Sequence, residues 1–188
     1  MKETGAEKAA SILRGGGVVL VPTETVVGLV AAEAWALNEI KGSDPGKPLA
    51  LLCASVEEAF SLAAEVPPPA RVLAEALWPG PLTLVLRRRG GGTVGVRLPA
   101  GAAVEVLRAY GGPLYATSAN PSGGPAPRSL DDVDPEVAAA ADLVVPGEPG
   151  SGEASAVVDF SGGEARLLRA TEAITGETLR KMAGGLRG

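Results

Sequence analysis

Several apolar segments of this chain end or begin in short clusters of hydroxyl, amide and guanidinium side chains. The segment PLYATSANPSGG (113–124) starts as an apolar run and turns into serine, asparagine and glycine within a few residues. Thr-Glu-Thr follows VVLVP (18–22), an arginine closes TVGVR (93–97), and a serine opens SAVVDF (155–160). Ligands of open α/β sheets bind beyond strand ends, where such groups can hydrogen-bond an anion or an amino acid. Each cluster alone has a simpler explanation, because Ser, Thr and Asn at strand ends commonly cap their own turns.

Bringing these clusters together requires a sheet, and the chain has the segments for one. Apolar runs of strand length alternate with helical segments, and a glycine turn between 81–88 and 93–99 predicts a hairpin. This alternation with hairpin connections favours an α/β (α+β) fold, in which helices pack on a mixed sheet in one domain. The expected strands are 18–22, 48–53, 81–88, 93–99, 113–118, 142–146, 155–160 and 165–170, with a turn into a strand or a short helix over 23–35.

Local signals predict helices between these strands. Thr4 and Glu7 have the spacing of a capping box, and Ser55 with Glu58 repeats it. Asp134-Pro135 has the residue types of an N-cap followed by the first helical position. The expected helices are 4–13, 55–64, a segment starting at the prolines 67–69, 101–109, one starting at 134–135, and 176–182.

The composition excludes several classes of chemistry. Histidine is absent, which rules out histidine general bases, Ser-His triads and histidine-ligated metals. Cys53 is the only cysteine, so we expect no disulfide and no thiolate zinc site, and a small core side chain there. A formal net charge of −5 disfavours a uniformly basic nucleic-acid binder, although Arg87, Arg88 and Arg89 form a local basic cluster.

Nothing in the sequence indicates a membrane or secreted protein. No apolar run reaches the roughly 18 residues that a membrane-spanning helix needs. The segment MKETGAEKAA lacks the apolar core of a signal peptide. We therefore expect a cytoplasmic protein.

Seven segments occur in an order and spacing that are typical of one family. They are VPTETVVGL, KGSDPGKPLALL, WPGPLTLVL, VGVRLP, ATSANPSGG, EASAVVDF and RLLRA. In these motifs the chain resembles the YrdC-like threonylcarbamoyl-AMP synthase family, over a core of about residues 9–170 in a single domain spanning 1–188. The resemblance implies a twisted mixed sheet with flanking helices around a central, concave and locally positive cavity. Longer family members have a second C-terminal domain, which we do not expect here.

The resemblance also implies an activity. Family members combine L-threonine with bicarbonate and use ATP to form threonylcarbamoyl-AMP with release of pyrophosphate, which is a nucleotidyltransferase reaction. The product serves the modification of adenosine 37 in tRNA, so tRNA or double-stranded RNA and tRNA-modification enzymes are the implied partners. Mg²⁺ would arrive with ATP, and no protein-bound metal is implied. Such chemistry needs positioning and charge neutralisation more than a side-chain nucleophile, which suits a chain without histidine.

Two sets of binding residues follow from the resemblance, and no firm catalytic side chain. Arg97 is expected to pair with the carboxylate of threonine through the fork of its guanidinium group. Ser118 and Asn120 are expected where threonine meets the nucleotide, which gives the polar end of the segment 113–118 a purpose. L-threonine is assigned to Thr23, Arg97, Ser118 and Ser155, and ATP to Lys41, Thr93, Asn120 and Arg169.

The sequence departs from the family pattern at several positions near this expected site. Lys41-Gly42-Ser43 stands where the family has Lys-x-Arg, so one phosphate-binding arginine is missing. Lys47 and Arg128 are candidates to compensate for that charge. Val27 replaces a family aromatic, usually tyrosine, and the segment 28–41 is several residues shorter than usual.

Three alternatives to an active synthase remain open from the sequence. The first is a divergent paralogue that binds a nucleotide or an adenylate without synthase activity, which the residue Ser43 favours. The second is an RNA-binding protein that uses Arg87–Arg89 and Arg128 on the rim of a cavity. The third is a carbamoyl-transfer module like those of hydrogenase-maturation proteins, although their zinc-finger and acylphosphatase regions are not found in this sequence.

Overall fold

A computed structural model describes residues 4–42 and 48–183 of the chain. The strands are β1 (Val18–Pro22), β2 (Val27–Ala31), β3 (Ala50–Leu52), β4 (Leu82–Arg87), β5 (Thr93–Arg97), β6 (Leu114–Ser118), β7 (Leu143–Val144), β8 (Ala156–Asp159) and β9 (Arg166–Arg169). The helices are α1 (Gly5–Arg14), α2 (Ala34–Lys41), α3 (Val56–Ser61), α4 (Pro68–Leu77), α5 (Ala102–Tyr110), α6 (Pro135–Ala139) and α7 (Gly176–Ala183), with a 3₁₀ turn at Leu130–Asp132.

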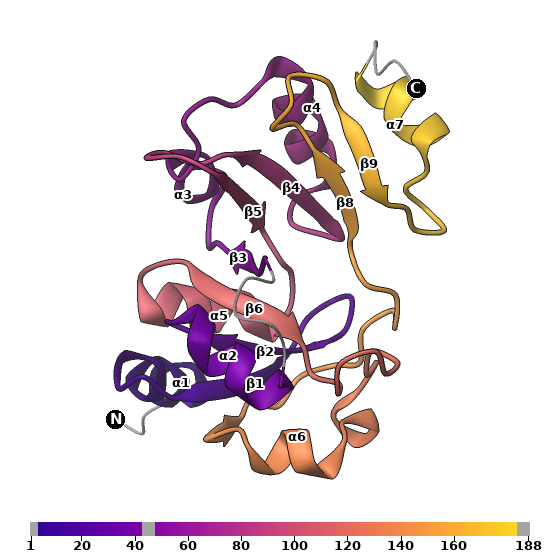
Figure 1. Ribbon diagram of the computed structural model, residues 1–188. Coiled ribbons are helices and arrows are strands. Elements are labelled where there is room, and N and C mark those ends of the chain that lie inside the picture. The colour runs from indigo at the N-terminus through magenta and orange to yellow at the C-terminus, as the bar shows by residue number, and fades with distance from the viewer. Residues whose placement is uncertain (1–3, 43–47, 184–188) are drawn as a thin grey trace.

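The strands form one twisted mixed sheet in the order β7-β1-β2-β6-β3-β5-β4-β8-β9. β1 with β2 and β4 with β5 pair antiparallel, whereas β3 with β5 and β4 with β8 pair parallel. In Figure 1, β1, β2 and β6 form one half of the molecule, β4, β5, β8 and β9 form the other, and β3 lies between them. The predicted α/β class, the mixed sheet and the hairpin of β4 and β5 are confirmed.

Local sequence signals account for the helix starts. The Thr4 side chain accepts a hydrogen bond from the Glu7 amide, and Glu7 accepts one from the Thr4 amide, so the predicted capping box is confirmed. Ser55 caps α3 by accepting from the amide of Glu58. The segment 23–35, predicted as a strand or a short helix, contains all of β2 and the start of α2.

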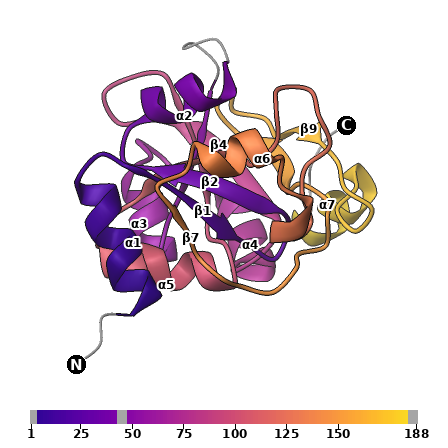
Figure 2. The same cartoon turned by 90° about the horizontal axis from the view of Figure 1, so that it is seen from below.

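The half of the sheet that contains β1 is covered by helices on both faces. Val19 and Val21 of β1 pack in one cluster with residues of α1 and α5. Val18 and Leu20 point the other way and pack in a second cluster with residues of α2 and α6. Figure 2 shows the two pairs of helices on opposite sides of β1 and β2. Burial on both faces explains why β1 is apolar at every position.

The half that contains β4 has helices on one face only. Leu82, Leu84 and Leu86 of β4 pack in a core cluster with residues of α3, α4 and α7. The alternate residues Thr83 and Val85 point to the opposite face, because successive strand side chains alternate. That uncovered face carries several polar side chains, among them Thr83 and Thr93.

Candidate functional site

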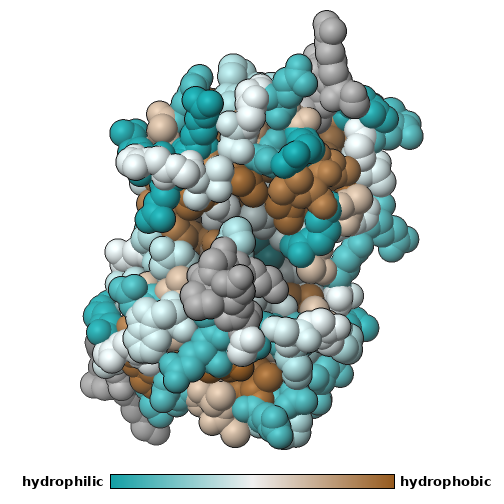
Figure 3. Space-filling view, viewed as in Figure 1, coloured by the Kyte–Doolittle hydropathy of each residue, from teal (hydrophilic) through white to brown (hydrophobic). Residues whose placement is uncertain are grey.

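The uncovered face of β4, β5 and β8 forms one wall of a cavity of about 760 Å³. The opposite wall comes from β2, β6 and the loop after β1. In the space-filling view of Figure 3, the surface of the molecule is hollowed between the two halves. A cavity of this size lies within the range of roughly 300–1,000 Å³ that is typical of small-molecule sites.

Most of the side chains that the sequence assigned to ligands meet at this cavity. The assigned residues that line it are Thr23, Thr93, Arg97, Ser118, Ser155 and Arg169. Lys41, Asn120 and Arg128 belong to the described part of the chain but do not line the cavity. Lys47, expected to compensate for a missing arginine, and Ser43, the position of that arginine, lie outside the described residues.

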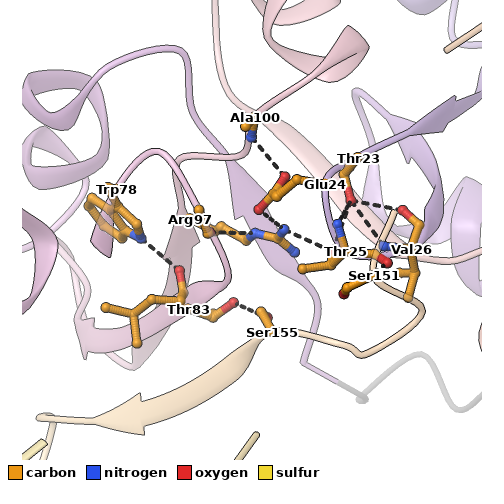
Figure 4. A network of polar contacts seen from close by, with 12 residues as sticks. Thr23, Glu24, Thr25, Val26, Trp78, Thr83, Arg97, Ala100, Ser151 and Ser155 are labelled. Carbon is orange, nitrogen blue, oxygen red and sulfur yellow. Dashed lines mark hydrogen bonds and ion pairs between the residues drawn. The ribbon is translucent and has the colours of Figure 1, made fainter. Parts of the chain in front are cut away.

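Arg97 is the centre of a hydrogen-bond network at the buried end of the cavity (Figure 4). Its Nε donates to the carbonyl of Gly80 at 3.2 Å, and its Nη2 donates to Oε1 of Glu24 at 2.5 Å and to Oγ1 of Thr25 at 2.8 Å. Oγ1 of Thr25 also lies 2.9 Å from Oγ1 of Thr23. The network connects the loop after β1 to the end of β5, although these elements are not neighbours in the sheet.

The hydroxyl of Thr23 is held within its own loop. It donates to the carbonyl of Val26 at 2.8 Å and accepts from the amides of Thr25 and Val26 at 3.2 and 3.3 Å. Thr23 is buried and still lines the cavity. Thr23 therefore caps its own turn, which is the simpler explanation for such a residue, and it also forms part of the cavity wall.

Ser155 and Arg169 form a second polar group on the same wall. Oγ of Ser155 lies 2.9 Å from Oγ1 of Thr83, and Arg169 donates from Nε to the Ser155 carbonyl at 2.6 Å and from Nη2 to its hydroxyl at 3.3 Å. The pKa of Arg169 is lowered, chiefly because burial disfavours its charge and secondly because the positive charge of Arg97 is nearby. An anion bound in the cavity would reduce the repulsion between these two guanidinium groups.

The end of β6 has a different organisation. Lys41 Nζ donates to the carbonyl of Ser118 at 2.9 Å and to the carbonyl of Asn120. The amide nitrogen of Asn120 donates to the carbonyls of Pro121 and Gly124 at 2.8 and 2.7 Å. Lys41 and Asn120 therefore stabilise the loop that follows β6, and Ser118 is the member of this group that lines the cavity.

Arg128 does not occupy the place that the sequence suggested for it. Its Nε donates to the carbonyl of Gly150 at 2.9 Å, and the Gly150 amide donates back to the Arg128 carbonyl at 2.9 Å. The segment around Gly150 crosses the loop after β1, with the amides of Ser151 and Gly152 donating to the carbonyls of Glu24 and Thr25. Arg128 therefore holds this crossing segment and is not among the residues that line the cavity.

From the sequence, Glu24, Thr25 and Thr83 had no ligand-binding role, and Arg88 was considered only for RNA binding. Glu24 and Thr25 bind the guanidinium of Arg97, and Thr83 and Arg88 line the cavity. The alternation of β4 could have identified Thr83, which stands on the face opposite to its leucines. The basic cluster is divided, since Arg87 and Arg89 donate to the carbonyls of Ser161 and Ser61.

The remaining candidates for chemistry in the described residues are few. Burial, and secondly the charge of Glu58, raises the pKa of the Cys53 thiol to about 12, so Cys53 is an unreactive core residue. Across residues 4–42 and 48–183, no three side chains of the His, Cys, Asp and Glu types gather as metal ligands. Over those ranges no helix is both long and apolar enough to cross a membrane.

The mixed α/β sheet gathers hydroxyl and guanidinium groups around one cavity, which makes this cavity a candidate binding site for a small polar ligand. The model of the family that comprises the Sua5, YciO and YrdC proteins, described as telomere recombination, matches residues 11–171. The chain therefore belongs to the Sua5/YciO/YrdC family, which confirms the resemblance seen in its motifs.

Named relatives and solved structures agree with this membership. The chain is 36% identical over 196 residues to a threonylcarbamoyl-AMP synthase of Pyrococcus abyssi, covering 95% of this chain and 57% of that protein. It is 32% identical over 181 residues to a putative threonylcarbamoyl-AMP synthase of Mycobacterium leprae, covering 88% and 82%. The crystal structure of P. abyssi Sua5 complexed with L-threonine matches with a TM-score of 0.87 and 33% identity, covering 100% of this chain and 59% of that one. The chain thus spans less than two thirds of the Pyrococcus protein.

Proposed function

We propose that this protein is a threonylcarbamoyl-AMP synthase. The observation that carries the proposal is the cavity itself, in which Thr23, Arg97, Ser118, Ser155 and Arg169 face a common space from separate elements. Relatives named threonylcarbamoyl-AMP synthase and the L-threonine complex of the Pyrococcus protein support the choice of substrates.

The proposed reaction has two steps. The amine of L-threonine attacks the carbon of bicarbonate, and loss of water leaves a carbamate. An oxygen of the carbamate then attacks the α-phosphorus of ATP, and pyrophosphate leaves to give threonylcarbamoyl-AMP. Both steps join anionic partners, so positioning and charge neutralisation by the site are the main requirements.

The side chains have distinct parts in this proposal. Arg97 binds the carboxylate of threonine, while Thr23, Ser118 and Ser155 hydrogen-bond its remaining polar groups. Thr93 and Arg169 bind the nucleotide, with Arg169 supplying a second positive charge on the cavity wall. Lys41 and Asn120 act near the phosphates through the loop that they hold, and Mg²⁺ arrives with ATP. The product would serve tRNA modification.

The test is pyrophosphate release by the purified protein with ATP, Mg²⁺, L-threonine and bicarbonate. We expect release that disappears when either L-threonine or bicarbonate is omitted, and a matched assay of the Pyrococcus protein provides the positive control. Absence of release alongside an active control would contradict the proposal. Thermal-shift measurements with AMP, ATP and L-threonine, each alone, would then identify a paralogue that binds nucleotide without the synthase step.

A further inference from the structure

Glu24 connects two loops at the buried end of the cavity. It lies between β1 and β2, and its side chain is 24% exposed. One carboxylate oxygen accepts from Nη2 of Arg97 at 2.5 Å, and the other accepts from the amide of Ala100 at 2.8 Å. The carboxylate therefore fixes the Arg97 side chain relative to the chain that leaves β5 (Figure 4).

A count of donors on Arg97 shows what this arrangement leaves for a ligand. A guanidinium group has five N–H donors, one on Nε and two on each terminal nitrogen. Nε is used by the carbonyl of Gly80, and both donors of Nη2 are used by Glu24 and Thr25. Within the described part of the chain, the two donors of Nη1 make no hydrogen bond, while Arg97 as a whole lines the cavity.

We propose that Glu24 is a positioning residue that orients Arg97 so that only Nη1 is available to the carboxylate of the substrate. The sequence suggested a forked contact made by two guanidinium nitrogens, whereas the structure favours an end-on contact made by one. This inference rests on the proposed function for the identity of that carboxylate. Glu24 acts through Arg97 and does not itself contact the ligand.

The charges of Glu24, Arg97 and Arg169 also indicate that Arg97 recognises the carboxylate by the direction of its donors. Glu24 neutralises Arg97, so attraction of an anion cannot depend on the net charge of this pair. Selection of a carboxylate then depends on where the Nη1 donors point, while Arg169 and Arg88 add further positive charges to the cavity wall. A change at Glu24 that moves the guanidinium should therefore affect carboxylate recognition more than nucleotide binding.

The test compares binding of L-threonine with binding of L-threoninamide, which lacks the carboxylate, by titration calorimetry. We expect the wild type to prefer L-threonine by roughly tenfold or more, as one charge-assisted hydrogen bond provides. Glu24→Gln should reduce this preference at least about fivefold, because a glutamine has one acceptor oxygen where the carboxylate has two. Its amide nitrogen would face a donor at Arg97 or at Ala100. Glu105→Gln, which alters an exposed glutamate paired with Arg108, is the matched control and should keep the preference.

A second variant separates position from charge. Glu24→Asp keeps the charge but is one methylene shorter, so it cannot reach both Nη2 of Arg97 and the Ala100 amide, and it should also lose the preference. If Glu24→Gln does not fold, the preference is measured with Glu24→Asp instead. ATP affinity, measured in parallel, should stay within about twofold in both variants.

The outcomes distinguish this inference from the proposed function. If the wild type does not bind L-threonine, the proposed function and the inference both fail. If the wild type prefers L-threonine and both Glu24 variants retain that preference, only the positioning role is overturned. The positioning role would also be overturned if Glu24→Asp retained the preference for L-threonine and Glu24→Gln lost it. The charge of residue 24, and not its position, would then determine the preference.

Discussion

Two loops that follow strands of the same sheet use similar residues in opposite ways. The loop after β1 contains Thr23, Glu24 and Thr25, and the latter two reach across to Arg97 and Ala100 on another part of the chain. The loop after β6 contains Asn120, whose amide nitrogen bonds to carbonyls one and four residues further along the same loop. The first loop contacts Arg97 and Ala100, which lie at the cavity and just after β5, whereas the second loop is held by its own backbone and by Lys41 of α2.

This difference shows when a polar cluster at a strand end belongs to a site. The explanation that Ser, Thr and Asn cap their own turns describes Asn120 well. It does not describe Glu24, whose two partners are both distant in sequence. Contacts between elements fix side chains relative to one another, which a ligand-binding cavity requires.

Replacing Arg97, the partner of the first loop, should have the largest effect on L-threonine affinity and on the free energy of unfolding. Arg97→Met removes the Nη1 donors and leaves Glu24 with the Ala100 amide as its remaining partner. Affinity for L-threonine should fall by about one to two decades, the value of a charge-assisted hydrogen bond. The free energy of unfolding should fall by about 1–3 kcal/mol because a partly buried carboxylate loses its counter-charge.

Titration calorimetry and urea unfolding measure these two effects. Arg108→Met is the control, since Arg108 is exposed and pairs with Glu105 on the surface of α5, and it should leave both quantities unchanged. Unaltered L-threonine affinity in Arg97→Met would show that the network at the first loop does not contact the ligand.

A pair of glycine substitutions compares the two loops directly. In Gly150→Ala, the new Cβ would lie 2.4 Å from the Thr25 carbonyl and 2.8 Å from that of Thr23, both backbone atoms. The crossing segment must then move off the first loop, so we expect a loss of about 1–3 kcal/mol in unfolding free energy and weaker L-threonine binding.

Gly123→Ala is the counterpart in the second loop. Nothing lies within 4 Å of its added Cβ, and the cost arises from a φ of +84°, which disfavours alanine by roughly 1–2 kcal/mol. L-threonine affinity should be unchanged, because the partners of this loop are its own backbone and Lys41, and not Arg97. Equal losses of affinity in the two variants would remove the distinction between the loops.

Much of the fold could be predicted because its signals are local. The capping box of Thr4 and Glu7 and the N-cap Asp134 need only neighbouring residues, and the structure has both. Strands such as β1 were predicted from a run of apolar residues alone. The shared position of Thr23, Arg97 and Ser155 at one cavity was expected from the family resemblance.

The missed features depend on which atoms meet after the strands have paired. The contact of Glu24 with the Ala100 amide requires the path of the chain after β5, which no local pattern specifies. The position of Arg128 depends on the crossing segment at Gly150, an irregular stretch without periodic residues. Both examples are hydrogen bonds to backbone groups, and backbone groups carry no sequence signal.

The smallest effect is expected at Asn120 of the second loop. Asn120→Ala removes the donors to the carbonyls of Pro121 and Gly124, and unfolding free energy should fall by about 1 kcal/mol. ATP affinity should fall several-fold because the loop near the proposed phosphate site loosens, whereas L-threonine affinity should change less than about twofold.

Ser122→Ala is the matched control for this loop. It removes only the bond from the Ser122 hydroxyl to the carbonyl of Lys41, which is exposed, and should leave both affinities unchanged. A tenfold loss of L-threonine affinity in Asn120→Ala would mean that the second loop also acts through contacts with the cavity. The two loops would then share one role, because the second loop, held by its own backbone and by Lys41, makes no contact with Arg97, the proposed ligand of the carboxylate.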